Sequence, residues 1–162
     1  MLFRSSVSFT AFAMGITAGV GTAWMMLFNG LMIGVVGAAC ARSGMSLSLW
    51  SFIAPHGALE LPAIFIAGGA GLLLGRALVA PGLLTRRDAL RTYGGTAVQL
   101  LLGVIPLLVI AGVIEGFVSP VPMNPAIKFV IGGALFVLLG LYLFVVGSRA
   151  ADQSRPLSFA SR

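Results

Sequence analysis

The residues of this sequence that could bind an ion or move a proton inside a membrane are one histidine and two glutamates. His56 and Glu60 lie one helical turn apart in the stretch PHGALELPA, residues 55–63, and Glu115 lies in IEGFVSP, further along the chain. All three border long apolar segments, where an ionisable side chain is costly unless it is paired or faces a cavity. One imidazole and two carboxylates would match a metal site with three protein ligands and an open position.

Two other interpretations of His56 and Glu60 stand beside a metal site. Pro62 belongs in the first turn of a helix, so a span would begin close to Leu59 or Glu60, with the carboxylate at unpaired backbone amides and His56 as its neighbour. Alternatively, Glu60 faces protein and forms a buried polar contact that fixes helix packing or a docking surface. The sequence has one histidine, the single Cys40 and no HExxH motif, so we expect no metal, no cofactor and no catalytic set.

The composition indicates the elements that must position these residues. Of 162 residues, 59% are hydrophobic and 9% are charged, and several apolar runs are about 20 residues long, which is the length that crosses a bilayer. We therefore predict an all-α fold, a polytopic helical transmembrane bundle with four to five spans and a short surface or re-entrant segment. The net charge of +6 is scattered without interleaved aromatic residues, so no nucleic-acid partner is expected.

The predicted layout is a single helical membrane domain, residues 1–147, followed by a polar tail, residues 148–162. The uncharged run from residue 7 to residue 41 is too long for one upright span. We expect it to break in AGVGTA, residues 18–23, or at Asn29 and Gly30, which gives two short spans or a span plus a re-entrant segment. The predicted spans cover residues of about 7–22, 24–41, 61–79, 96–118 and 126–147.

Four further segments carry expectations about the membrane. GMSLSLWSFIA, residues 44–54, suits a piece lying at the membrane surface with Trp50 at the level of the headgroups. The predicted loop over residues 76–91 is arginine-rich and therefore cytoplasmic, the loop over residues 119–125 is external, and the C-terminal tail is cytoplasmic. This orientation places the histidine and both glutamates near the outer leaflet of a bacterial cytoplasmic (inner) membrane. The arginines on which this predicted orientation rests are Arg76, Arg86, Arg87 and Arg91.

Small residues share the helical face of Glu60. At about 100° per residue, Ala67 and Gly71 lie within roughly 20° of Glu60, and Ala63 and Gly75 lie about 60° to either side. Such a stripe lets another helix approach closely. We therefore expect Glu60 to point at a packed interface.

Three motifs resemble those of the stage II sporulation protein M family. They are FNGLMIG at residues 28–34, APHGALELPAIFIAGGAGLLLGRAL at residues 54–78 and LLGVIPLLVIAGVIEGFVSP at residues 101–120, and the resemblance extends over residues of about 9–145. It implies a polytopic protein of the cytoplasmic membrane that anchors peptidoglycan hydrolases in sporulating bacteria, with further members in bacteria that form no spores. The residues in the matching motifs, to which the resemblance assigns no catalytic role, are Asn29, His56, Glu60, Pro62 and Glu115.

The sequence departs from the pattern of this family in one respect. Members of the family usually carry an extra N-terminal region with its own span, and this chain begins about where that region would end. We expect the sequence to be a fragment, a late start or a short relative.

The leading functional prediction is a non-enzymatic integral-membrane scaffold or anchor for cell-envelope, peptidoglycan-remodelling partners. Its expected partners are the lipid bilayer, other membrane or envelope proteins such as peptidoglycan hydrolases, and further copies of itself. The alternative is a transporter or channel component that uses the carboxylates near the outer leaflet. A lesser alternative is a membrane metalloenzyme with His56, Glu60 and Glu115 as ligands.

Overall fold

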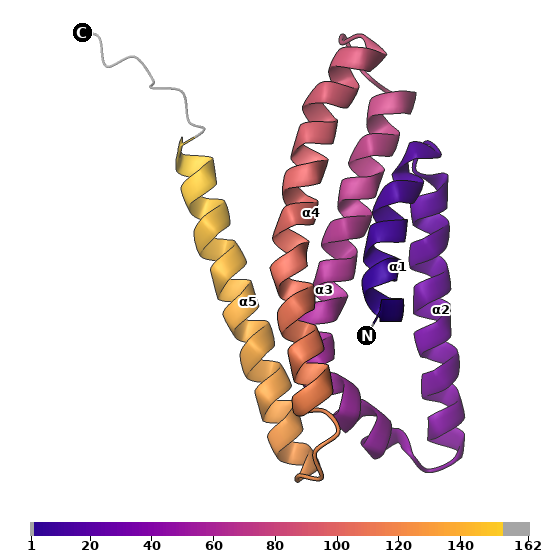
Figure 1. The fold of residues 1–162 in the computed structure, drawn as a ribbon, viewed down its shortest axis with the longest axis vertical. Coiled ribbons are helices and arrows are strands. Elements are labelled where there is room, and N and C mark those ends of the chain that lie inside the picture. The colour runs from indigo at the N-terminus through magenta and orange to yellow at the C-terminus, as the bar shows by residue number, and fades with distance from the viewer. Residues whose placement is uncertain (1, 154–162) are drawn as a thin grey trace, which may run out of the picture.

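The computed structural model describes the backbone of residues 2–153 and the side chains of residues 7–148. Figure 1 shows a bundle of helices, and the described residues contain no β-strand, which confirms the predicted all-α fold. In chain order the elements are α1 (Leu2–Ala13), the 3₁₀ helix η1 (Met14–Ile16), α2 (Val20–Arg42), α3 (Ser46–Val79), α4 (Arg86–Phe117) and α5 (Pro125–Gln153).

Four of these helices are long and apolar enough to cross a membrane. They are α2, α3, α4 and the part of α5 from Pro125 to Ser148. Successive long helices alternate in direction in Figure 1, so the α3–α4 loop lies at one end of the bundle and the α4–α5 loop at the other. The chain is therefore a multi-pass membrane protein. The expected span over residues 7–22 is wrong, because the short α1 ends at Ala13 and the chain turns before α2.

The turn between α1 and α2 uses two left-handed residues, Ala18 with φ of 57° and Gly19 with φ of 83°. Thr17 stabilises this turn, since its Oγ1 donates to the carbonyl of Met14 at 2.6 Å and accepts from the amide of Gly21 at 2.9 Å. The turn falls within and just before the expected AGVGTA break. The other expected break, at Asn29 and Gly30, is wrong because α2 continues through it. In lipid, a continuous helix satisfies its own backbone hydrogen bonds, which outweighs the turn preference of Asn and Gly.

Helix α3 differs most from expectation. It begins at Ser46, not near Leu59, and it contains both Pro55 and Pro62. The predicted surface segment, residues 44–54, is mostly its first turns, which run obliquely to the rest of the helix in Figure 1. Proline bends a helix, and membrane helices tolerate it because neighbouring groups satisfy the freed carbonyl. The exposed Trp50 lies in these first turns, and its place at the headgroups stays a prediction.

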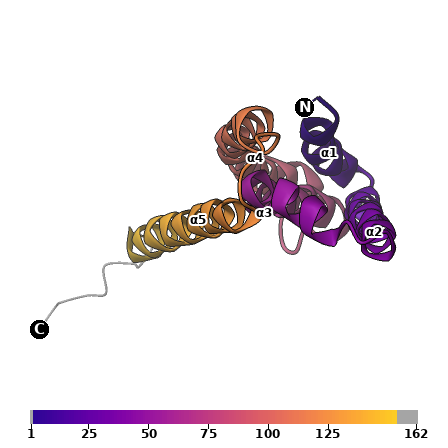
Figure 2. The same ribbon diagram turned by 90° about the horizontal axis from the view of Figure 1, so that it is seen from below.

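Helix α3 is also the centre of the bundle. Figure 2 shows α1 and α2 on one side of it and α4 and α5 on the other. A Cβ added at Gly132 of α5 would collide with the backbone of Ala54, so the two helices touch closely there. Further contact comes from Leu139, which packs with Leu59 and Ala111. Beyond this end, α5 diverges from the bundle (Figure 1).

The small residues of α3 divide between two neighbours. Gly71 and Gly75 lie against the backbone of the first segment, because a Cβ on Gly71 would be 2.7 Å from the carbonyl oxygen of Ala11 and one on Gly75 would be 2.5 Å from the amide nitrogen of Gly19. A further buried cluster joins Ala63 and Ala67 to Val104 of α4. Gly15 of η1 in turn lies against Gly71. The close approach that such stripes permit thus places the short α1 and η1 on α3.

Side-chain caps define the two helix starts after α3. Thr85 Oγ1 accepts from the amide of Asp88 at 3.2 Å, which caps α4, and the side-chain Oδ1 of Asn124 accepts from the amide of Ala126 at 2.9 Å, just before Pro125. The connection between α3 and α4 is consequently short, residues 80–85, and the expected long loop over residues 76–91 is wrong. The polar tail expected from residue 148 starts as helix, and residues 154–162 lie outside the described part.

Candidate functional site

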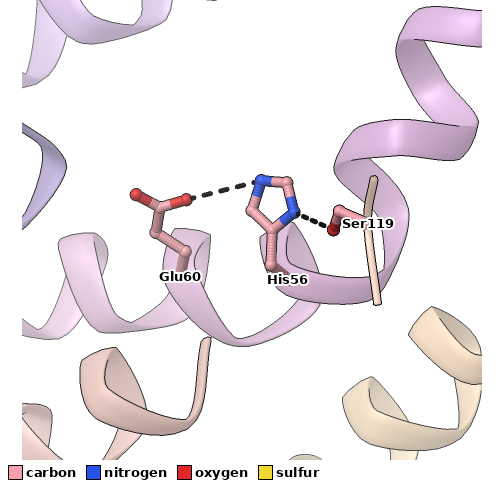
Figure 3. A network of polar contacts seen from close by, with 3 residues as sticks. All are labelled: His56, Glu60 and Ser119. Atoms are coloured by element: carbon pink, nitrogen blue, oxygen red, sulfur yellow. Dashed lines mark hydrogen bonds and ion pairs between the residues drawn. The ribbon is translucent and has the colours of Figure 1, made fainter. Parts of the chain in front are cut away.

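A polar network lies at the end of the bundle that carries the α4–α5 loop. Figure 3 shows the His56 ring on α3 between the carboxyl group of Glu60 and the hydroxyl group of Ser119. His56 Nδ1 and Ser119 Oγ are 2.9 Å apart, and His56 Nε2 and Glu60 Oε2 are 3.9 Å apart. The histidine and glutamate share one face because they are one turn apart on α3, whereas Ser119 comes from the end of α4.

The geometry favours one tautomer of His56. A carboxyl group facing Nε2 favours a proton on that nitrogen, which leaves Nδ1 to accept a hydrogen bond. Ser119 can then donate its hydroxyl proton to Nδ1. The contact with Glu60 is electrostatic, since 3.9 Å exceeds the length of a hydrogen bond.

The network is almost closed to its surroundings. The exposed fractions are 0% for Ser119, 1% for His56 and 5% for Glu60. The ring of Phe52 packs edge-on against the imidazole, with centroids 5.8 Å apart. Buried polar groups of this kind stabilise one arrangement when they are paired and are costly when they are not.

Lys128 extends the network to a third element. It lies in the first turn of α5, it is 7% exposed, and its Nζ donates to the carbonyl oxygen of Ser119 at 2.7 Å. A cation at the C-terminal end of α4 is favourable, because the last carbonyls of a helix lack partners and carry negative partial charge. Ser119 therefore connects α3 through its side chain and α5 through its backbone.

The other residues singled out in the sequence lie apart from a common centre. Glu115 is half-buried on α4, and His56 meets Ser119, one turn further along, instead of Glu115. Within the described residues, no three His, Cys, Asp or Glu side chains gather as metal ligands would. Asn29 is half-buried on α2, and Pro62 lies inside α3, where the expected helix start at Glu60 is wrong.

The order Ser119, His56, Glu60 resembles that of a nucleophile, its base and an orienting acid. A nucleophile must be reached by its substrate, however, and the Ser119 hydroxyl is fully buried in this conformation. The chemistry that the arrangement supports directly is structural. It joins α3, the end of α4 and the start of α5 through polar contacts in an apolar setting.

Sequence reasoning did not identify Ser119 and Lys128 as members of the site. A signal existed for each. Lys128 is a charge in an apolar helix, which needs an acceptor, and Ser119 ends an apolar span next to the prolines of the loop. Neither signal could predict the contact between Ser119 and His56, because these residues are far apart in the sequence.

Comparison with known proteins identifies a family. The family model described as stage II sporulation protein M matches residues 1–120, which include His56, Glu60 and Ser119 and end before α5. No curated protein and no solved structure matches the chain.

Proposed function

We propose, from the premise that the chain belongs to the stage II sporulation protein M family, that it is an integral-membrane scaffold which anchors cell-envelope partners, in particular peptidoglycan-remodelling enzymes. The observation that carries the proposal is the buried network under the α4–α5 loop, residues 118–124. The contact between His56 and Ser119 links this loop to α3. A loop held in this way is a preorganised docking surface, because less conformational entropy is lost when a partner binds.

The proposed orientation places this loop outside the cytoplasm. Four arginines lie at or near the α3–α4 loop, whereas the opposite end has Arg42 and the buried Lys128, and positive charge near spans favours the cytoplasmic side. The protein then lies in the bacterial cytoplasmic membrane with its C-terminus inside. The arginines are Arg76, Arg86, Arg87 and Arg91.

The surface of the loop suits a protein partner. Pro120, Val121 and Pro122 are exposed, whereas Ser119 just before them is buried. Exposed apolar and proline residues on a fixed backbone supply contact area at low entropic cost. The proposed partner is therefore an extracytoplasmic segment of an envelope enzyme.

Photocrosslinking from the loop tests this role. A photoreactive amino acid replaces Val121 in the full chain, in cells, and captured proteins are identified by mass spectrometry. The matched control carries the same amino acid at Leu83, an exposed apolar residue of the α3–α4 loop. We expect Val121 to capture a defined envelope protein that Leu83 does not.

The capture must also depend on the network. Ser119→Ala removes the bond to His56 and should reduce capture from position 121 without loss of the protein from the membrane. Identical capture from positions 121 and 83, or capture of lipid alone, would refute the scaffold role.

A transporter component is the second candidate, and one observation favours it. Glu60 lies about four turns into α3, inside a span instead of at its start, and the chain also breaks between α1 and α2, at a turn that lies against Gly75 of α3. Broken helices and buried carboxyl groups are features of ion and proton paths. Flux through liposomes that contain the purified protein, lost in Glu60→Gln, would establish this function in place of the scaffold.

A further inference from the structure

The end of the bundle that carries the α3–α4 loop, residues 80–85, has four exposed arginines. Within the residues that the structure describes, none of the four forms an ion pair. The only acidic residue in the sequence from 61 to 114 is Asp88, whose carboxyl group accepts a hydrogen bond from the Thr85 hydroxyl at 2.6 Å. This end of the bundle is therefore a site of uncompensated positive charge. The arginines are Arg76, Arg86, Arg87 and Arg91.

The arginines of α4 lie where positive charge is unfavourable. Arg86 and Arg87 form the start of the helix, at the positive end of its dipole. Arg87 and Arg91 are four residues apart, so their side chains are neighbours on the helix surface and repel each other. An anion bound between Arg87 and Arg91 would relieve both effects. Guanidinium groups pair with phosphate through two parallel hydrogen bonds, which makes phosphate a fitting anion.

The length of α4 places these arginines at the level of the lipid headgroups. The helix has 32 residues and is therefore about 48 Å long, whereas the hydrocarbon core of a bilayer is roughly 30 Å thick. Arg76 of α3 lies at the same end, because its Cζ is 5.6 Å from the centre of the Tyr93 ring on α4. Figure 1 shows this end of α3 and α4 extending beyond the α1–α2 turn.

One face of α4 continues from the arginines into the apolar part of the span. At about 100° per residue, Val98, Leu102 and Ile105 lie within roughly 60° of the directions of Arg87 and Arg91. These three apolar side chains are 48%, 60% and 39% exposed. From Arg91 to Ile105 the helix rises about 21 Å, which matches half of a bilayer of roughly 40–45 Å with its headgroups.

Gly94 and Gly95 separate the arginines from the apolar side chains of this face. A Cβ added at Gly95 would meet nothing within 4 Å, and one at Gly94 would meet only Leu74 Cδ2, at 3.7 Å. A bound molecule can therefore approach the helix backbone there. From the end of α4 inward, this face presents positive charge, then open backbone, then exposed apolar side chains.

We propose that this face of α4 binds an anionic phospholipid. The phosphate lies between Arg87 and Arg91, the glycerol lies against the two glycines, and an acyl chain follows the three apolar side chains. A free anion would use the arginines alone, whereas a phospholipid covers all three parts of the face. A zwitterionic phospholipid fits less well, because the arginines repel its ammonium group. The inference does not rest on the scaffold role, since it concerns the opposite end of the bundle.

Native mass spectrometry tests the choice of lipid. The full chain is purified in detergent, stripped of lipid and titrated with phosphatidylglycerol or with phosphatidylcholine that has the same acyl chains. We expect phosphatidylglycerol to bind about tenfold more tightly, because only this lipid presents a phosphate without an ammonium group. An excess of inorganic phosphate should leave the bound lipid in place.

Two arginines at opposite ends of the bundle provide the first matched variants. Arg91→Gln should weaken the binding of phosphatidylglycerol about fivefold, because one of the two guanidinium groups at the phosphate is lost. Arg42→Gln is the control, since Arg42 is an exposed arginine in the last turn of α2. It removes the same charge and should leave the binding unchanged.

Two glycines of α4 provide the second pair. Gly95→Leu places a side chain over the turn that carries Arg91 and should weaken the binding of phosphatidylglycerol. Gly103→Leu is the control, because a Cβ at Gly103 also meets nothing within 4 Å, but it points about 100° away from Leu102. Both substitutions are at exposed positions of the same helix, so this comparison holds even if Arg91→Gln does not fold.

Four results would overturn the inference. They are equal binding of the two lipids, equal effects of Arg91→Gln and Arg42→Gln, equal effects of the two leucine variants, and displacement of the lipid by inorganic phosphate. The last result would identify a site for a free anion in place of a phospholipid.

Discussion

Ser119 determines how the two ends of the α4–α5 loop are held. Its hydroxyl group meets His56 at 2.9 Å and its carbonyl accepts from Lys128 at 2.7 Å, both in a buried setting. A buried donor or acceptor that loses its partner keeps its desolvation cost. Substitution of Ser119 should therefore weaken the packing among α3, α4 and α5.

Ser119→Ala should lower the free energy of unfolding by about 1–3 kcal/mol, because Nδ1 of His56 loses its partner in a buried site. Chemical unfolding in detergent micelles measures the difference. Ser43→Ala is the control, since the exposed Ser43 hydroxyl bonds only to the nearby Ala39 carbonyl at 3.1 Å. Equally small effects of both variants would show that the contact with His56 does not contribute to the free energy of unfolding.

A double-mutant cycle isolates the pair itself. His56→Phe keeps a ring against Phe52 and removes both nitrogens, and it is combined with Ser119→Ala. Residues in one hydrogen-bonding network show coupling energies of about 0.5–3 kcal/mol, which is the result expected here. Additive effects of the two substitutions would mean that the side chains do not act together.

At the scale of elements, α3 organises the bundle through residues with little or no side chain. Gly71 and Gly75 admit the backbone of α1 and of the α1–α2 turn, while Ala63 and Ala67 admit α4. Thr22 adds a buried bond across the hairpin, from its Oγ1 to the Ala11 carbonyl at 2.7 Å. Helices that lack a hydrophobic driving force in lipid depend on such close packing.

Gly71→Val should destabilise the protein by about 1–3 kcal/mol, because its Cβ would lie 2.6 Å from Thr22 Oγ1 and crowd the backbone of α1. The matched control is Gly69→Val, which has nothing within 4 Å on the same helix. Thermal unfolding in detergent, followed by size-exclusion chromatography, compares them. If Gly69→Val were as harmful as Gly71→Val, helix propensity instead of packing would explain both.

At the scale of the whole molecule, the two loop ends of the bundle differ in charge and in construction. One end has short, arginine-flanked turns, with Arg76 stacked 5.6 Å from the ring centre of Tyr93. The other has the buried network and an exposed proline-rich loop. This asymmetry supports a defined orientation in the membrane.

Cysteine accessibility measures that orientation. In a Cys40→Ala background, Val121→Cys should react with a membrane-impermeant maleimide added to intact cells. Leu83→Cys should react only after the membrane is opened, because the arginines nearby favour the cytoplasmic side. The reverse pattern would place the α4–α5 loop in the cytoplasm and remove the basis for an external partner.

The sequence by itself determined the membrane class, the all-α fold and the family. These follow from local properties, because apolar run length and backbone hydrogen bonding in lipid leave few alternatives to helices. The small-residue face of α3 could also be read locally, since it depends only on the helical period. The ends of the helices were predicted less well from the sequence. Pro62 indicated a helix start, yet α3 passes through both of its prolines.

The tertiary structure alone decided which residues meet. His56 was expected near Glu115 from depth, but the end of α4 brings Ser119 to the imidazole and the start of α5 brings Lys128 to Ser119. Depth along separate spans follows from hydropathy, whereas the rotation and crossing of helices follow from packing between them.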